Sequence, residues 1–315
     1  MAQNKPTIAI SVGDINGVGL EILLREHNFV CSLCRPIYCV HSAILDRAME
    51  LLGNHISISD EYISPPKGFN SVLPHISVGC IDEVSGRYSF ESFIHACDLA
   101  DCKQAQAILT LPIHKESWHK AGIAFIGHTY ALRERYNKEA IMMLGCEEMF
   151  VALFTEHIAL SQVSKRIDTE SLCSFLLHFA QCEKLTEPCA VLSLNPHCGD
   201  GGLMGNEDSI IASAIEATNA TLQKQIFKGP YAPDSAFAPH NRAKFRYFVS
   251  MYHDVGLSVL KALHFEKSIN VSLNLPIIRT SVDHGVAFDI AYKGIASTQS
   301  YKNALLYALK AIGTQ

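Results

Sequence analysis

Short, mostly apolar segments alternate with segments of helical periodicity in this chain, and no other feature restricts its fold as strongly. The apolar segments lie at residues 7–12, 37–40, 107–111, 150–154, 190–194 and 246–252. Apolar residues recur at helical spacing in residues 41–52, 89–105, 169–182 and 301–312. Short strands without polar alternation are typical of a parallel sheet that helices cover on both faces. The sequence therefore predicts an α/β fold with a mainly parallel sheet.

Composition and charge exclude several classes of protein. With 48% hydrophobic and 18% charged residues, the chain is not disordered. A net charge of -5 without a Lys/Arg run argues against nucleic-acid binding. No window of about 18 consecutive apolar residues predicts a membrane span. The 11 scattered cysteines and the absence of a signal-peptide pattern predict a cytoplasmic protein without a disulfide framework.

Two short motifs say little about chemistry by themselves. The loop Gly13–Gly19 follows the first strand and precedes a helix expected from Leu20, but it is neither GxGxxG nor a Walker A sequence. A dinucleotide, if bound, is therefore not held in the usual Rossmann manner. Cys31 and Cys34 form a lone CxxC, which we interpret as buried or idle thiols.

Three histidines each follow a predicted buried strand. These are His157, His197 and His253. Ligands bind at the carboxyl ends of parallel strands, so the three rings could converge on one metal ion. Imidazole suits Zn, Co, Ni and Fe, whereas Mg prefers oxygen. Since the chain has 15 histidines, surface or packing roles remain an alternative. A metallohydrolase and a non-catalytic metal-binding protein are further alternatives.

Polar residues in the last third of the chain suggest an anionic ligand. Lys261, Asn270 and Arg279 follow His253, and cations near a metal could bind a phosphate or a carboxylate. The alternative for each is a solvated surface position. Residues 283–291 mix polar groups into an apolar context, which indicates a folded loop with a specific role.

Six longer motifs carry a resemblance to a known family. They are Ser11–Glu21, Thr110–Lys115, Gly127–Thr129, Leu194–Gly202, Met251–Asp254 and Leu275–Gly285. Over essentially its whole length the chain resembles the 4-hydroxythreonine-4-phosphate dehydrogenases of pyridoxal phosphate biosynthesis. The family shares its fold with isocitrate and isopropylmalate dehydrogenases. The resemblance therefore implies two interwoven three-layer α/β/α domains with a cleft between them. We place the first in residues 1–126 plus 285–315 and the second, with the metal and dimer contacts, in residues 127–284.

The resemblance also implies roles for individual residues. It makes His157, His197 and His253 the ligands of a divalent metal, namely Zn, Co or Mg. In the family the third histidine reaches the site from the other subunit, which implies a homodimer with its active site at the subunit interface. The implied substrate contacts are His128, Thr129, Lys261, Asn270 and Arg279. The implied catalytic residues are Lys261, Asp254 and Asp234, and the choice of proton carrier between Lys261 and Asp254 stays open. His284, Gly285 and Asp289 are implied to bind NAD or NADP.

The activity that the resemblance implies is the oxidation of a small phosphorylated hydroxy amino acid. The NAD(P)- and metal-dependent reaction converts 4-phosphohydroxy-L-threonine to a 3-oxo acid, which decarboxylates to 3-amino-2-oxopropyl phosphate. The alternative is a related dehydrogenase acting on a phosphorylated threonate-type acid or a cis-dihydrodiol. Four positions depart from the family pattern: Tyr130, Glu156, Val255 and Tyr292.

Overall fold

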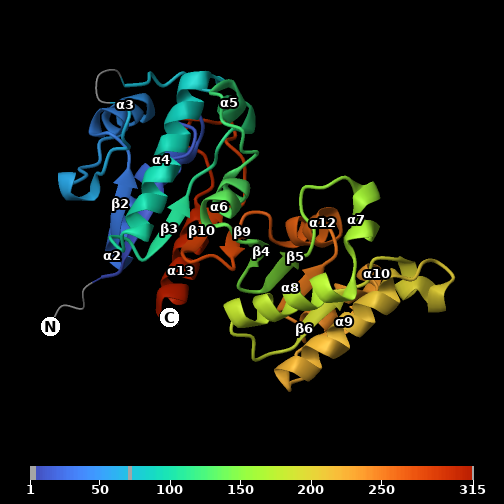
Figure 1. Ribbon diagram of the computed structural model, residues 1–315. Helices are drawn as coiled ribbons and strands as arrows, with labels where there is room; N and C mark the ends of the chain where they lie inside the picture. The colour runs from blue at the N-terminus through green and yellow to red at the C-terminus, as the bar shows by residue number, and fades with distance from the viewer. Residues whose placement is uncertain (1–4, 70–72, 314–315) are drawn as a thin grey trace. The chain divides into compact units, whose positions relative to one another are not determined.

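The computed structural model describes residues 5–69 and 73–313 and divides the chain into two compact units (Figure 1). The first unit comprises Met1–Lys138, Ile269–Val271 and Leu275–Gln315, and the second comprises Glu139–Ser268 and Ser272–Asn274. Strand β9, Ile269–Leu273, has residues in both units. Segments from both ends of the sequence therefore build the first unit, in agreement with an interwoven organisation.

The first unit contains a parallel sheet with strand order β2-β1-β3-β10. Its strands are β1 (Thr7–Ser11), β2 (Arg35–Cys39), β3 (Ala107–Thr110) and β10 (Ile278–Val282). Its helices are α1 (Gly19–Arg25), α2 (His27–Leu33), α3 (Ser42–Leu52), α4 (Glu83–Asp101), α5 (Lys115–Lys120), α6 (His128–Tyr136) and α13 (Gln299–Gly313), with a short 3-10 turn η1 (Asp60–Tyr62). Helix α4 packs against β1, β2 and β3, and α13 packs against β3 and β10.

The second unit contains the strand order β4-β5-β8-β6-β7. Its strands are β4 (Ile141–Cys146), β5 (Met149–Leu153), β6 (Cys189–Leu192), β7 (Phe227–Tyr231) and β8 (Tyr247–Ser250). Strands β4 and β5 form an antiparallel hairpin, whereas the pairs β5–β8, β8–β6 and β6–β7 are parallel. The helical segments are α7 (Leu160–Arg166), α8 (Thr169–Cys182), η2 (Pro196–Gly202), α9 (Glu207–Leu222), α10 (Pro233–Ala236), α11 (Pro239–Arg242) and α12 (His253–His264). Helix α12 packs on β4, β5 and β8.

These observations confirm the predicted α/β class and its mainly parallel sheet. The six strands and five helices expected from the sequence match β1, β2, β3, β5, β6 and β8, and α1, α3, α4, α8 and α13. Residues 127–138 and 275–284 lie in the first unit, although we expected them in the second domain. The reason is packing, because Leu132 of α6 joins Phe93 and Trp118 in a buried cluster, and β10 pairs with β3.

The loop that follows β1 is held very close to the backbone after β3. Asp14 donates its backbone N–H to the carbonyl oxygen of Pro112 at 2.8 Å. A Cβ atom at Gly13 would lie 2.1 Å from that oxygen, and Gly13 has a φ of +67°. Only glycine avoids both the steric overlap and the left-handed strain at this position. No described helix is long and apolar enough to cross a membrane.

This contact predicts a large stability difference between two glycine substitutions. Gly13→Ala should lower the free energy of unfolding by about 3 kcal/mol or more, since steric overlap adds to backbone strain. Gly53→Ala is the matched control, because Gly53 has a φ of +60° but nothing lies within 4 Å of a Cβ there. Its expected loss is about 1 kcal/mol. Urea unfolding measures both, and equal losses would contradict the packing argument.

Candidate functional site

Two of the three predicted metal-binding histidines lie side by side in the second unit. Strands β5 and β8 are parallel neighbours, and Leu153 is in register with Ser250. The pairing continues beyond the strands, because the Thr155 N–H and hydroxyl both donate to the carbonyl oxygen of Met251, at 3.2 and 2.6 Å. The rings of His157 and His253 follow, with centroids 5.5 Å apart. The strand-end argument from the sequence thus brings this pair together.

Carboxylates flank both rings of the pair. Asp254 Oδ1 lies 2.7 Å from Nδ1 of His253, at the start of α12. This bond occupies Nδ1, which leaves Nε2 as the ring nitrogen of His253 that can bind another partner. Glu156 Oε2 lies 3.8 Å from Nδ1 of His157. Glu156, a departure from the family pattern, therefore adds negative charge beside the pair.

His197 lies on an exposed turn that follows β6, the other neighbour of β8. It has a φ of +51° and begins a run of left-handed residues through Gly202. Asp208 anchors the start of this turn by accepting hydrogen bonds from Leu194 N at 2.8 Å and from Asn195 N at 3.2 Å. His197 thus has a fixed backbone but an exposed side chain.

In the first unit, a buried cation lies within the sheet. Arg279 of β10 is 2% exposed and donates to Thr110 Oγ1 at 2.8 Å and to Asn270 Oδ1 at 3.3 Å. Burial lowers the pKa of Arg279 to about 10, so the guanidinium stays charged at neutral pH. A buried arginine that the side chains of Thr110 and Asn270 hold in place is suited to bind an anion.

His128 lies near this cation and is neutral at physiological pH. Its ring packs on Phe93 and Trp118, with centroids 4.7 and 5.4 Å away. Burial, with a smaller contribution from the positive charge of Arg279, holds the pKa of His128 well below its usual value. In the described part of the chain its Nε2 has no hydrogen-bond partner. Thr129 is buried beside it at the start of α6.

The predicted cofactor segment packs on the glycine loop of the first unit. Val18 N donates to the carbonyl oxygen of Val286 at 3.0 Å. The Tyr292 hydroxyl donates to the carbonyl oxygen of Ile15 at 2.6 Å, and Tyr292 has a φ of +59°. Tyr292 thus adopts a left-handed backbone of the kind that glycine usually takes, and its hydrogen bond stabilises it. Gly285 and Asp289 are exposed and His284 is half-buried.

The remaining predicted catalytic residues lie on helices of the second unit. Lys261 is half-buried on α12, and its Nζ is 5.2 Å from the centroid of the Phe265 ring. Asp234 is exposed at the start of α10. Val255 packs against the hydrophobic cluster of this unit.

Known proteins resemble the chain over nearly its full length. Residues 32–308 match the family model described as pyridoxal phosphate biosynthetic protein PdxA. The 4-hydroxythreonine-4-phosphate dehydrogenase of Sulfurimonas denitrificans is 53% identical over 306 residues, which cover 97% of this chain and 98% of that protein. The chain belongs to the PdxA family. A relative of the same name from Campylobacter fetus is 49% identical over 306 residues, covering 97% of this chain and 98% of that protein.

A solved structure of a PdxA relative agrees with this fold. The crystal structure of 4-hydroxythreonine-4-phosphate dehydrogenase from Klebsiella pneumoniae matches with a TM-score of 0.82 at 28% identity, covering 99% of each chain. Membership in the PdxA family makes the chain an oxidoreductase of pyridoxal phosphate biosynthesis. A dehydrogenase of this family implies a nicotinamide cofactor and a metal.

The PdxA sequence motifs did not reveal the residues that support this site. Asp208, Thr110 and Thr155 hold the segments that carry His197, Arg279 and His157. Asp208 and Thr155 are buried polar residues at helix or strand ends, which is a weak signal in a single sequence. Thr110 ends a predicted strand, but its partner lies far away along the chain.

The buried His128 predicts a specific pH dependence of stability. In the unfolded chain His128 takes up a proton near pH 6.5, whereas the folded chain does so only at lower pH. The free energy of unfolding should therefore decrease below pH 6.5, and His128 should contribute up to about 1.4 kcal/mol of this decrease per pH unit. Urea unfolding at pH 7.5 and 5.5 should show a smaller difference for His128→Gln than for the unchanged protein.

A matched control is His119→Gln, at an exposed histidine of α5. It should retain the full pH difference. Parallel pH profiles for His128→Gln and the unchanged protein would refute the assignment of a neutral, buried imidazole.

Proposed function

We propose that the chain oxidises 4-phosphohydroxy-L-threonine to a 3-oxo acid that loses CO2 to give 3-amino-2-oxopropyl phosphate, with NAD or NADP as acceptor. The observation that carries this proposal is the pairing of His157 with His253 at adjacent strand ends, in a chain 53% identical to a dehydrogenase named for that substrate. The anion-binding arginine of the first unit supports a phosphorylated acid as substrate rather than an uncharged dihydrodiol.

The donor set suits a divalent metal. His157, His197 and His253 would hold it, and Zn2+ or Co2+ match imidazole ligands better than Mg2+ does. Asp254 supports this role, because a carboxylate on the second nitrogen orients a ligating histidine. When bound, the metal supplies a Lewis acid for the substrate hydroxyl, and the nicotinamide accepts the hydride.

The protein's own residues then bind and orient the substrate. Arg279 is held in place before any ligand arrives, so little entropy is lost when it grips a phosphate or a carboxylate. The neutral His128 can share a hydrogen bond through Nε2, with Thr129 and Asn270 adding polar contacts. Together these groups fix the charged ends of the substrate.

We assign proton transfer to Lys261. Asp254 already uses Oδ1 on His253, so its main role is to orient that ring. Lys261 lies two turns further along α12, on the helix that begins with His253. Asp234, exposed on α10, is assigned an accessory electrostatic role.

The segment around His284, Gly285 and Asp289 is proposed to bind the nicotinamide cofactor. Nothing lies within 4 Å of a Cβ atom placed on Gly285, so a ligand can approach the backbone closely. The exposed carboxylate of Asp289 can accept hydrogen bonds from ribose hydroxyls. The contacts between residues 286–292 and the loop after β1 hold this segment without GxGxxG.

We further propose a homodimer that completes the metal site. Because His157 and His253 lie together in one chain, we assign the partner's ligand to His197 and not to His253, the third histidine along the sequence that the resemblance implies. His157 and His253 lie together in one chain, whereas His197 stands exposed on its own turn. Large apolar side chains beside these histidines are exposed, with Leu203 at 85% and Leu160 at 67%. Such exposed apolar groups are typical of a surface that binds another protein.

The activity itself is tested by nicotinamide reduction with three substrates. Phosphohydroxythreonine should give NADH or NADPH, a phosphothreonate or a cis-dihydrodiol should give far less, and chelator should abolish the signal. His253→Ala should lower turnover by more than about 100-fold through loss of a ligand. His240→Ala, at an exposed histidine of the same unit, should have no effect. Activity that persists in chelator and in His253→Ala refutes the scheme.

Sharing of the metal site between subunits is tested by mixing inactive variants. After dissociation and reassociation, His197→Ala with His253→Ala should recover up to about a quarter of normal activity, because half the dimers are mixed and each has one complete site. A mixture of His157→Ala and His253→Ala should stay inactive, since those two ligands come from the same chain. The opposite pattern would show that His197 is not the ligand contributed by the partner.

A further inference from the structure

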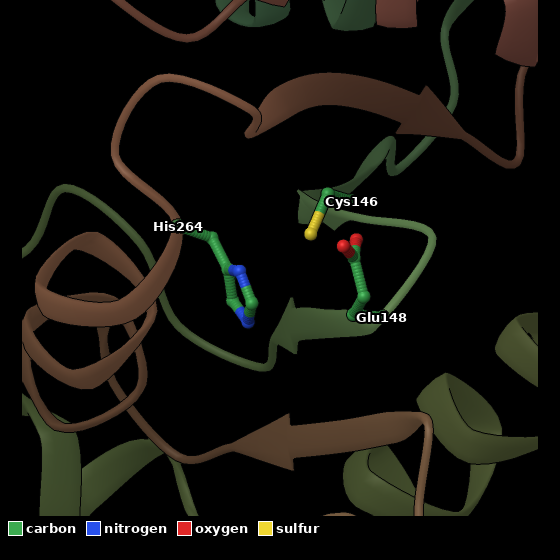
Figure 2. A group of neighbouring side chains, drawn as sticks. All are labelled: Cys146, Glu148 and His264. Carbon is green, nitrogen blue, oxygen red and sulfur yellow. The ribbon is translucent and has the colours of Figure 1, made fainter.

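A second group of potential metal ligands lies in the second unit, away from the histidine pair. Cys146 ends β4, Glu148 lies in the turn before β5, and His264 ends α12 (Figure 2). One ligand atom from each residue lies within 4.8 Å of the other two. Among residues 5–69 and 73–313, no other group of three or more His, Cys, Asp or Glu side chains has its ligand atoms this close together within one chain.

The chemistry of these three side chains matches zinc. A thiolate, an imidazole and a carboxylate are the usual zinc ligands, at about 2.3 Å from sulfur and about 2.0 Å from nitrogen or oxygen. In a tetrahedral site such ligand atoms lie roughly 3.3–3.6 Å apart, so the observed spacing needs closure by little more than about 1 Å. A thiolate ligand also selects against Mg2+, which prefers oxygen.

The charged residues around Cys146, Glu148 and His264 are compatible with a bound cation. Lys267 Nζ lies 2.6 Å from Glu148 Oε1, so the second carboxylate oxygen can still face Cys146 and His264. A ligating carboxylate commonly holds a hydrogen bond on its other oxygen. Arg246 lies 3.7 Å from Glu147 across the same turn, so each of these cations has an acidic partner. The Cys146 thiolate and the Glu148 carboxylate would bring two negative charges to a divalent ion, one of which Lys267 already offsets.

This group lies at the opposite end of the strands from the proposed catalytic site. Glu148 precedes the first residue of β5, whereas His157 follows its last residue. His253 and His264 occupy the two ends of α12, about 16 Å apart at 1.5 Å per residue. One metal ion cannot serve both groups within a chain.

We propose that Cys146, Glu148 and His264 bind a Zn2+ ion that ties the β4–β5 turn to the C-terminal end of α12. On binding, the thiol proton is released to solvent and a Zn–S bond forms, without change of oxidation state. Water fills the fourth position. The ion stabilises the second unit and takes no part in the dehydrogenase reaction.

Binding of Co2+ tests this site, because a Co2+ ion bound to a thiolate gives a characteristic absorption band. The full chain is stripped of metal and titrated with Co2+ in a His157→Ala/His253→Ala background, which disables the other proposed site. A thiolate-to-cobalt charge-transfer band should appear with about one equivalent of Co2+. It should vanish in Cys146→Ser and persist in Cys102→Ser, at an exposed cysteine of the first unit. Zn2+ should displace Co2+, and Mg2+ should not.

Zinc affinity gives a second measurement that does not depend on the buried cysteine. His264→Gln, at a half-buried side chain, should weaken Zn2+ binding by about 100-fold or more and abolish the zinc-dependent rise in melting temperature. Absence of the band in the His157→Ala/His253→Ala background, or unchanged Zn2+ affinity in His264→Gln, overturns the proposal. In that case the cluster is only a thiol–carboxylate hydrogen bond. Neither result bears on dehydrogenase activity, which is tested separately.

Discussion

The parallel pairing of β5 with β8 is the constraint on which the second unit's chemistry depends. Hydrogen bonds from Phe154 N to Ser250 O at 2.9 Å, and from Thr155 to Met251 O, carry the pairing past the strand ends. This extension holds His157 against His253. Because Thr155 is buried and donates twice to one carbonyl, the segment before His157 has little freedom to move. The proposed ligand pair is positioned by backbone pairing and is therefore organised before a metal binds, which reduces the entropy lost on binding.

The first unit uses close backbone packing for a similar purpose. Residues 286–296 cross the loop after β1 through Val18, Tyr292 and the buried Glu21, which accepts the Ala296 N–H at 2.9 Å. A Cβ atom on Gly17 would lie 2.7 Å from the carbonyl oxygen of Val286, so these backbones approach as closely as glycine permits. The two loops thus form one surface. A protein that lacks GxGxxG can still present backbone N–H groups and a carboxylate to a dinucleotide in this way.

The sequence predicted most of the strands whose residues are uniformly apolar, although it missed the apolar strand β4, and it missed strands that bury polar groups. The sequences of strands β5, β8 and β6 are clearly apolar, and the histidines were identified because each follows the end of one of these predicted strands. Strands β9 and β10 contain Asn270 and Arg279, which interrupt the apolar pattern. The buried Arg279 donates hydrogen bonds to Asn270 and to Thr110, and Thr110 lies far away in the sequence. No local pattern encodes such a partner, and the same holds for Asp208 under the turn that carries His197.

The two ends of helix α12 differ in their electrostatic environment. The helix dipole places partial positive charge at the N-terminus, beside His253, and partial negative charge at the C-terminus, beside His264. A cation near His253 is therefore disfavoured by the helix and needs anionic compensation, which Asp254 and Glu156 supply. A cation near His264 is favoured by the helix itself, and at the proposed zinc site one carboxylate and one thiolate would add to this attraction. The same helix can thus place a reactive, carboxylate-supported metal at its start and a structural ion at its end. The proposed site at His253 requires the carboxylates of Asp254 and Glu156, and the proposed site at His264 requires the thiol of Cys146.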